Sequence, residues 1–446
     1  MNRLTSREHP GAELLLGDVR VLDPRVGLEK RMDVRISGGA IAELGEWGTL
    51  APQPAEELIS GEGRLLLSPA FFDPHVHMRT PGQEHKEDIE SGTRAAAAGG
   101  FAGVIAMPNT APVLDSPELL SSLRELAGEQ AHVPVGFLPA ITLGLQGEQL
   151  TDMAALHEQG ALGFSDDGKP VTSAGLLRKA LQLQRTCGGV IALHEEDPTL
   201  SAGGAMNEGT VSAELGIAGI PTLAESTMVA RDAAIASYED ARMHFQHLSC
   251  TASVEAVAQA KAHGWRVSSE VSPHHLLLTD EDVRSLDTRM KMHPPLTTES
   301  DRQALIEGLR SGVIDCVATD HAPHSRAEKD VPFEQAANGT TGLETAFAAL
   351  YTGLVVTGVI ELGMLIERMS AGGALFGVPA PRIAVGEPAN LALIDLDAVW
   401  TAGEHGWESR SDNCCFAGRR LQGRVLLTLA AGGIAHRDEA LAMVGA

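Results

Sequence analysis

The feature that most constrains the fold of this chain is a regular alternation of short apolar segments and helix-like segments over residues 68–377. Most apolar segments have the length of a buried strand, and each is followed by a stretch rich in Ala, Leu and Glu. Eight such units over about 310 residues are typical of a parallel (β/α)8 TIM barrel, so the sequence predicts an α/β fold. The candidate strands are LLLSPAFFDPHVH, FAGVIAMP, VPVGFLPAI, ALGFSDD, GVIALHEE, ARMHFQHLS, WRVSSEVSP and IDCVATDHAPH.

The two ends of the chain have a different pattern. Residues 1–67 and 378–446 alternate apolar and polar positions in short runs that Gly, Asp and Pro separate. This pattern indicates antiparallel strands joined by turns. We therefore expect the two ends to form one small β-sandwich domain, with the barrel of residues 68–377 inserted between them.

The charge of the chain limits its partners. It has 34 Lys and Arg against 59 Asp and Glu, which gives a formal net charge of −25. Nucleic acids and anionic membrane surfaces repel such a protein, so we expect neither as a partner. An anion that binds here must be held by a local positive group, such as an arginine or a metal ion.

Other features predict a reduced, cytoplasmic protein. The five cysteines are scattered and contain no CxxC pair, which argues against a disulfide framework and against a thiolate metal site. The N-terminal segment has no apolar signal core. Residues 95–114 and 345–360 lack charge, but glycines and prolines interrupt the first and the second is only sixteen residues long. We expect both to be buried parts of the barrel rather than membrane spans.

Residues that can bind metals recur where the predicted strands end. The carboxyl ends of TIM-barrel strands carry the active site. In the first strand, the period of two places His75, His77 and Arg79 on one face, so that two imidazoles can share one metal ion. The further candidates at strand ends are Asp166, Asp167, His194, His247, Asp320 and His324.

The coincidence of these residues is more informative than any one of them. Five of the eight predicted strands end in His or Asp, which scattered polar residues would not produce. Nitrogen and oxygen ligands without thiolates suit Zn²⁺, and the number of candidates fits two ions with a bridging carboxylate. Such a site generates a hydroxide nucleophile near neutral pH, with Asp320 as the candidate for proton transfer. The residues therefore predict metal-assisted hydrolysis of a carbonyl compound.

Several longer motifs resemble those of a known family. The segment DPHVHMRTPGQEHKEDIESGTRAAAAGGFAGVIAMPNTAPV is similar to the signature of type I dihydroorotases, in the amidohydrolase superfamily. Further similar segments are FSDDG, VSPHHLLLT, KMHPPL and ATDHAPHSRAEK. The resemblance implies reversible, zinc-dependent cyclisation of N-carbamoyl-L-aspartate to L-dihydroorotate in de novo pyrimidine (UMP) synthesis. In the hydrolytic direction a metal-bound hydroxide would be the nucleophile.

The resemblance also implies a ligand set. His75 and His77 would hold one zinc ion, His194 and His247 a second, and Asp167 would bridge them. Asp320 would be both a ligand and the proton shuttle. Two alternatives for the bridge stay open: Asp166, and a carboxylated Lys169 as in related cyclic amidohydrolases.

The same resemblance assigns substrate contacts. Arg79 and Asn109 would hold the substrate carboxylate, and His77 and His324 would be further contacts. Three features depart from the family pattern: His293 stands where Asn is common, Asn338-Gly339 where Phe-Gly is common, and Glu195 where Cys is common. We expect these departures to affect substrate choice more than metal binding.

Two other functions remain to be tested. One is hydrolysis of another cyclic amide, as by a hydantoinase, dihydropyrimidinase or allantoinase. The other is a non-catalytic, dihydroorotase-like scaffold for aspartate carbamoyltransferase, although the chain keeps all six candidate ligands. The resemblance further implies a homo-oligomer and a possible complex of the active chain with that transferase.

Overall fold

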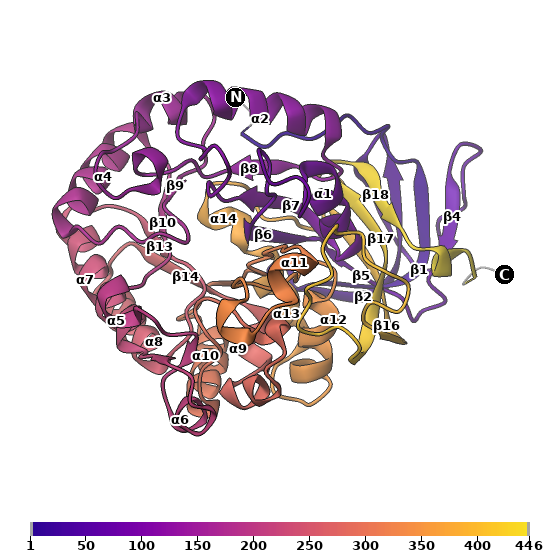
Figure 1. Cartoon of the computed structure of the whole chain (residues 1–446). Coiled ribbons are helices and arrows are strands. Elements are labelled where there is room, and N and C mark those ends of the chain that lie inside the picture. The colour runs from indigo at the N-terminus through magenta and orange to yellow at the C-terminus, as the bar shows by residue number, and fades with distance from the viewer. Residues whose placement is uncertain (1–2, 444–446) are drawn as a thin grey trace.

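A computed structural model describes residues 3–443 and contains a barrel joined to a β-rich domain (Figure 1). Eight short parallel strands form the barrel, in two hydrogen-bonded groups, β6-β7-β8 and β9-β10-β13-β14-β15. They are β6 (Phe71–Val76), β7 (Phe101–Ala106), β8 (Val135–Phe137), β9 (Phe164–Ser165), β10 (Ile191–Leu193), β13 (Met243–Phe245), β14 (Val267–Val271) and β15 (Cys316–Val317).

Backbone hydrogen bonds close the two gaps between these groups. Between β8 and β9, the Leu162 amide donates to the Phe137 carbonyl at 3.1 Å. Between the segment after β15 and β6, the His77 amide donates to the His321 carbonyl at 2.9 Å, beside a parallel bridge from Val76 to His321. The strands therefore form a closed ring, and the prediction of a TIM barrel is confirmed.

Helices surround the ring of strands (Figure 1). Side chains cap the first turn of several of these helices, as Asp88 does for α1 and Thr298 for α10, which fixes where those helices begin. The main helices are α1 (Ile89–Ala98), α2 (Pro117–Gln130), α3 (Met153–Glu158), α4 (Ala174–Cys187), α7 (Leu223–Tyr238), α8 (Thr251–Ala262), α10 (Glu299–Ser311) and α13 (Leu362–Ser370). Shorter elements in the loops are α5 (Pro198–Ser201), β11 (Met206–Asn207), α6 (Thr210–Leu215), β12 (Gly219–Ile220), α9 (Pro273–Leu277), α11 (Arg326–Lys329), α12 (Ala346–Leu350) and α14 (Gly372–Leu375).

The two ends of the chain build one β-sandwich domain, as predicted. Its strands are β1 (Leu14–Asp23), β2 (Leu28–Ser37), β3 (Ala40–Glu46), β4 (Glu57–Ser60), β5 (Leu66–Pro69), β16 (Leu391–Thr401), β17 (Arg420–Ala430) and β18 (Gly433–Arg437). They pair in the order β18-β17-β16-β5-β1-β2-β3, with β4 beside β1, so the yellow and indigo strands are neighbours in Figure 1. The antiparallel pairing of β5 with β16 joins the two ends, and an apolar cluster of its own fills the domain.

One predicted strand is in fact two. The segment 65–77 breaks at Ala70, where β5 of the sandwich ends and β6 of the barrel begins. Leu67 packs into the core of the sandwich and Phe71 into the core of the barrel. Both parts are apolar and buried, so the hydrophobic pattern did not reveal the change of sheet. The domain boundaries at 67/68 and 377/378 stay a prediction, although β5 extends the sandwich sheet to Pro69.

The uncharged segments lie within the folded structure. Residues 345–360 form α12 and a π-helical turn (Tyr351–Val355), which pack against the barrel core. No helix within residues 3–443 is both long and apolar enough to cross a membrane. The five cysteines are free thiols, and four of them are buried.

Candidate metal centre

Four histidines and two aspartates meet at the carboxyl ends of the barrel strands, and all six are buried. His75 lies in β6 and His77 directly after it. The others follow β9, β10, β13 and the last strand: Asp167, His194, His247 and Asp320. The structure thus brings together the six predicted metal ligands, which are up to 245 positions apart in the sequence.

The six side chains form two overlapping groups. The ligand atoms of His75, His77 and Asp320 lie within 4.8 Å of one another, and so do those of His75, Asp167 and His247. Asp167 Oδ1 is 3.4 Å from His75 Nε2 and 3.9 Å from both His194 Nδ1 and His247 Nε2. Asp167 therefore lies between the two histidine pairs, where a bridging carboxylate would be needed.

The hydrogen bonding of His75 tests whether this group fits a metal ion. Its Nδ1 lies 2.7 Å from Oε1 of Glu270, so one ring nitrogen is fixed by a carboxylate. Its Nε2 is buried without a hydrogen-bond partner and points between Asp167 and Asp320, at 3.4 and 3.5 Å. A carboxylate behind the ring and a free nitrogen in front are the usual environment of a metal-binding histidine. The residues fit a divalent cation with nitrogen and oxygen ligands.

The electrostatics of the cluster also favour a cation. Burial alone would raise the pKa of Asp320, but the neighbouring His75 and His77 outweigh it and hold that pKa below its ordinary value. Burial likewise opposes ionisation of Asp167, and the histidines again lower its pKa. Both carboxyl groups are therefore ionised near neutral pH, and their negative charges face the unpartnered nitrogen of His75.

The two alternatives for the bridge lie elsewhere. The Asp166 carboxylate turns away from the cluster and accepts from the amides of Ile141 and Thr142, at 2.7 and 3.0 Å. Burial raises its pKa to about 6. Lys169 is exposed in the turn after β9. Of the three candidates, only Asp167 reaches the histidines.

Arg79 is a buried cation next to this cluster. The strand ends at Val76, so the period of two does not extend to Arg79, and a φ of 56° turns the chain there. Arg79 Nε donates to the Pro323 carbonyl at 3.1 Å, and Nη2 lies 3.3 Å from His324 Nε2. Among residues 3–443, no carboxylate forms an ion pair with this guanidinium. A buried arginine without an anionic partner is suited to bind an anionic ligand.

Asn109 contacts the cluster directly. Its Oδ1 lies 2.8 Å from His77 Nδ1, and its Nδ2 donates to Asp167 at 3.3 Å. Asn109 therefore orients one predicted ligand and the predicted bridge. Its contact with a substrate carboxylate stays a prediction.

The remaining predicted contacts divide into two places. His324 Nε2 lies 2.8 Å from the Asn338 carbonyl, which puts the Asn338-Gly339 pair beside Arg79. At Gly339 the φ is +130°, and a Cβ would come within 2.6 Å of the Ala322 side chain, so this position requires glycine. His293 lies elsewhere, against His194, with ring centroids 5.2 Å apart.

Comparisons with known proteins place the chain in a family. A model described as "Dihydro-orotase-like" matches residues 63–253. The dihydroorotase of Syntrophus aciditrophicus (strain SB) is 41% identical over 96% of this chain and 100% of that protein. The dihydroorotase of Anaeromyxobacter dehalogenans (strain 2CP-C) is 43% identical over 94% of this chain and 96% of that protein. The chain belongs to the dihydroorotase family. The prediction of an enzyme, a hydrolase acting on a cyclic amide, is thereby confirmed.

Solved structures with the same fold extend this comparison. The L-hydantoinase (dihydropyrimidinase) from Arthrobacter aurescens has a TM-score of 0.85 at 24% identity, with 96% of each chain covered. The D-hydantoinase (dihydropyrimidinase) from a Thermus species has a TM-score of 0.81 at 24% identity, with 95% of each chain covered. These likenesses confirm the barrel with its β-sandwich domain.

Two carboxylates of this dihydroorotase-family chain were missed by sequence reasoning. Glu270 is fully buried in β14 and lies against His75 and also against His244, whose Nε2 is 2.9 Å away. Glu196 lies 3.3 Å from His194 Nε2. A glutamate inside the predicted barrel strand that contains VSSEV was a usable signal, because a buried carboxylate needs a partner. Glu196 follows His194 by two positions and had no comparable signal.

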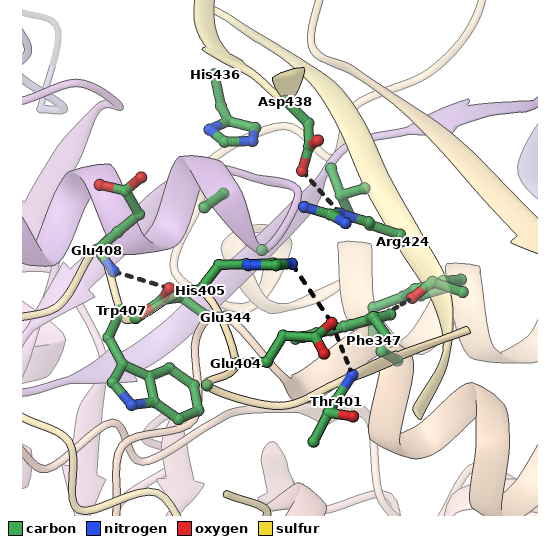
Figure 2. A pocket seen from close by; sticks show the side chains of 18 residues that line it. Glu344, Phe347, Thr401, Glu404, His405, Trp407, Glu408, Arg424, His436 and Asp438 are labelled. Atoms are coloured by element: carbon green, nitrogen blue, oxygen red, sulfur yellow. Dashed lines mark hydrogen bonds and ion pairs between the residues drawn. The ribbon is translucent and has the colours of Figure 1, made fainter. Parts of the chain in front are cut away.

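A separate pocket lies where the β-sandwich meets the barrel (Figure 2). It encloses about 190 Å³ and is lined by Phe347, Trp407 and several charged side chains. Figure 2 shows Glu344 on its wall, where it accepts from the amides of Glu408 and Ser409 at 2.9 and 3.1 Å. Burial raises the pKa of Glu344 to about 7. None of the predicted site residues lines this pocket.

Proposed function

We propose that this protein is a dihydroorotase, which interconverts N-carbamoyl-L-aspartate and L-dihydroorotate with loss or gain of water in de novo pyrimidine synthesis. The observation that carries the proposal is the buried, unpaired guanidinium of Arg79 beside the histidine–aspartate cluster. A ring amide that also bears a carboxylate matches this pair of features. The uncharged rings of hydantoin and dihydrouracil would leave Arg79 without an anion.

The metal we propose is Zn²⁺, with two ions per chain. His75 and His77 would hold one, His194 and His247 the other, with Asp167 shared and Asp320 as a further ligand. The unpartnered Nε2 of His75 and the absence of a thiolate from these groups support zinc. Bound zinc polarises a carbonyl group and lowers the pKa of a water molecule.

Asp320 is the residue we propose for proton transfer. In hydrolysis, water adds to the ring carbonyl carbon, a C–O bond forms and the C–N bond breaks. Asp320 takes the proton from the water and returns it to the departing nitrogen, and cyclisation runs through the same steps in reverse. The neighbours that lower its pKa keep Asp320 ionised near neutral pH, which is the form that a proton acceptor requires.

The substrate would bind between Arg79 and the cluster. Arg79 would hold its carboxylate, and Asn109, His77 and His324 would line the same space. His293, Asn338 and Gly339 are the positions at which we expect this chain to differ from relatives in substrate affinity.

One experiment tests these proposals together. Zinc content and the hydrolysis of L-dihydroorotate, dihydrouracil and hydantoin are measured on a single preparation. We expect about two zinc ions per chain and a strong preference for L-dihydroorotate over the two uncharged rings. Turnover of only the uncharged rings would instead indicate a hydantoinase-type enzyme. A folded, metal-free and inactive chain would indicate a scaffold.

The assembly and location of the protein are part of the proposal. We propose a cytoplasmic homo-oligomer, with a possible complex with aspartate carbamoyltransferase. Size-exclusion chromatography with light scattering, with and without that transferase, tests both assemblies. A monomeric mass under all conditions would contradict them.

A further inference from the structure

His194 has two ring nitrogens in different surroundings. Its Nδ1 faces the cluster, 2.8 Å from His247 Nε2 and 3.9 Å from Asp167 Oδ1. Its Nε2 faces outward, 3.3 Å from Oε2 of Glu196. If Nδ1 is to bind a metal, the ring proton must be on Nε2, and a carboxylate at that nitrogen stabilises this tautomer.

Glu196 is itself held in place on both oxygens. Its Oε1 accepts from the Ser201 hydroxyl, in the short helix α5 that follows the strand end. Its Oε2 contacts Nε2 of His293 as well as His194. The carboxylate is mostly buried, with 13% of the side chain exposed, so its orientation is set by these neighbours rather than by solvent.

His293 closes the arrangement from the opposite loop. Its ring stacks on the ring of His194, with an angle of 17° between the planes. The loop is fixed on both sides of His293, because the Gly339 amide donates to the Lys291 carbonyl at 2.8 Å and His275 Nε2 lies 3.1 Å from the Pro294 carbonyl. His293 therefore contacts both His194 and the carboxylate behind it.

We propose that Glu196 and His293 form a clasp that positions His194 as a ligand of the second metal ion, with His293 acting through Glu196. This inference rests on the metal centre of the proposed function. It gives His293, the residue that departs from the family pattern, a positioning role toward the metal. Neither residue is a catalytic residue in this proposal, because both contact His194 from its outer side.

The alternative is that His194, Glu196 and His293 themselves hold a cation, since their ligand atoms lie within 4.8 Å of one another. That arrangement requires His194 to bind metal through both nitrogens and so to lose its ring proton. A hydrogen bond from the Nε2 proton to Glu196 needs no such deprotonation. The clasp is therefore the simpler account, and the two differ in the number of ions bound.

The test measures zinc affinities on the full-length protein by competition with a chromophoric chelator. The variants are E196A, E196Q, H293A and the double variant E196A/H293A. E404A is the matched control, because Glu404 and His405 form a Glu–His pair 3.5 Å apart that is far more exposed. Circular dichroism shows that each variant is folded, and the visible spectrum of the Co²⁺-loaded protein reports the ligand geometry directly.

We expect E196A to weaken one of the two zinc sites by about 10- to 100-fold and to leave the other unchanged. E196Q should recover most of this loss, since its amide oxygen also accepts from Nε2. H293A should lower the zinc affinity less than E196A does. The double variant should lower it no more than E196A, because His293 acts through Glu196. E404A should change neither affinity nor spectrum.

Three results would overturn the inference. Wild-type affinities and cobalt spectra in E196A would remove the role of the clasp while leaving the proposed metal centre intact. A third zinc ion in the wild type that H293A and E196A both lose would make the three residues ligands. A wild-type protein that binds no zinc would refute the metal centre of the proposed function and the clasp together.

Discussion

Replacing Arg79 by methionine tests how the protein recognises its substrate. Arg79 Nε already donates to the Pro323 carbonyl. A substrate carboxylate would therefore bind the terminal nitrogens of the guanidinium group. A hydrogen bond to a charged group contributes about 1.5–3 kcal/mol. Loss of a carboxylate held by one to two such bonds costs about 3 kcal/mol, which corresponds to roughly 100-fold in affinity.

This loss should appear in KM and not in kcat. The carboxylate is held equally in the ground state and in the transition state, because it does not take part in the bond changes. We therefore expect R79M to raise the KM for L-dihydroorotate about 100-fold and to change kcat only slightly. Steady-state kinetics over a wide substrate range measure both constants.

Dihydrouracil, which lacks the carboxylate, is the internal comparison. Any slow hydrolysis of this ring should have the same kcat/KM in R79M and in the wild type. R326M is the control variant, because Arg326 lies two residues beyond His324 but is 80% exposed and paired with Asp412. An unchanged KM for L-dihydroorotate in R79M, or an equal loss for both substrates, would refute the assignment of Arg79.

Further variants test the proton shuttle, the metal and the pocket of Figure 2. D320A should abolish turnover at saturating substrate, and substantial residual kcat would exclude Asp320 as the shuttle. Removing metal with a chelator should stop turnover and lower Tm by several degrees, both restored by Zn²⁺; a Tm that does not respond would contradict stabilisation by the metal. The folded pKa of about 7 for Glu344 lies above the ordinary 4.5, so this group stabilises the folded protein at low pH and loses that contribution as pH rises through 7. Between pH 4.5 and pH 8, the free energy of unfolding of the wild type should thus fall by up to about 3 kcal/mol relative to that of E344Q, as measured by urea titrations. The same pH dependence in both proteins would contradict this.

The convergence of the candidate ligands could be predicted because strand geometry determines it. A buried strand presents alternate residues to one side, so His75 in β6 and His77 directly after it were expected to point the same way. The carboxyl ends of parallel strands lie at one end of a barrel, which brought Asp320 to His75 although the sequence separates them widely. The periodicity of a strand and the order of strands and helices can both be read from sequence patterns. Together they are enough to predict which side chains meet in the cluster.

Other features depend on contacts that no local pattern records. The break at Ala70 was hidden because the residues on both sides are apolar and buried. The choice between Asp166 and Asp167 depends on which carboxylate finds backbone donors, and the loop containing Ile141 and Thr142 supplies them to Asp166. Adjacent residues of the same type differ here only in their tertiary partners.

The carboxylates behind the histidines show why a ligand set read from sequence remains incomplete. Each ring nitrogen that faces a metal requires a partner at the other nitrogen, and three different segments supply these partners: Glu270 to His75, Asn109 to His77 and Glu196 to His194. Glu270 comes from another strand, Asn109 from the loop after β7, and Glu196 from the residues that follow the strand of His194. Strand-end periodicity selects residues that point into the centre, whereas these partners approach from its outer side. In the proposed metal centre, affinity would therefore depend on residues that a search for ligands does not select, and variants at those positions should alter zinc binding even when every ligand is present.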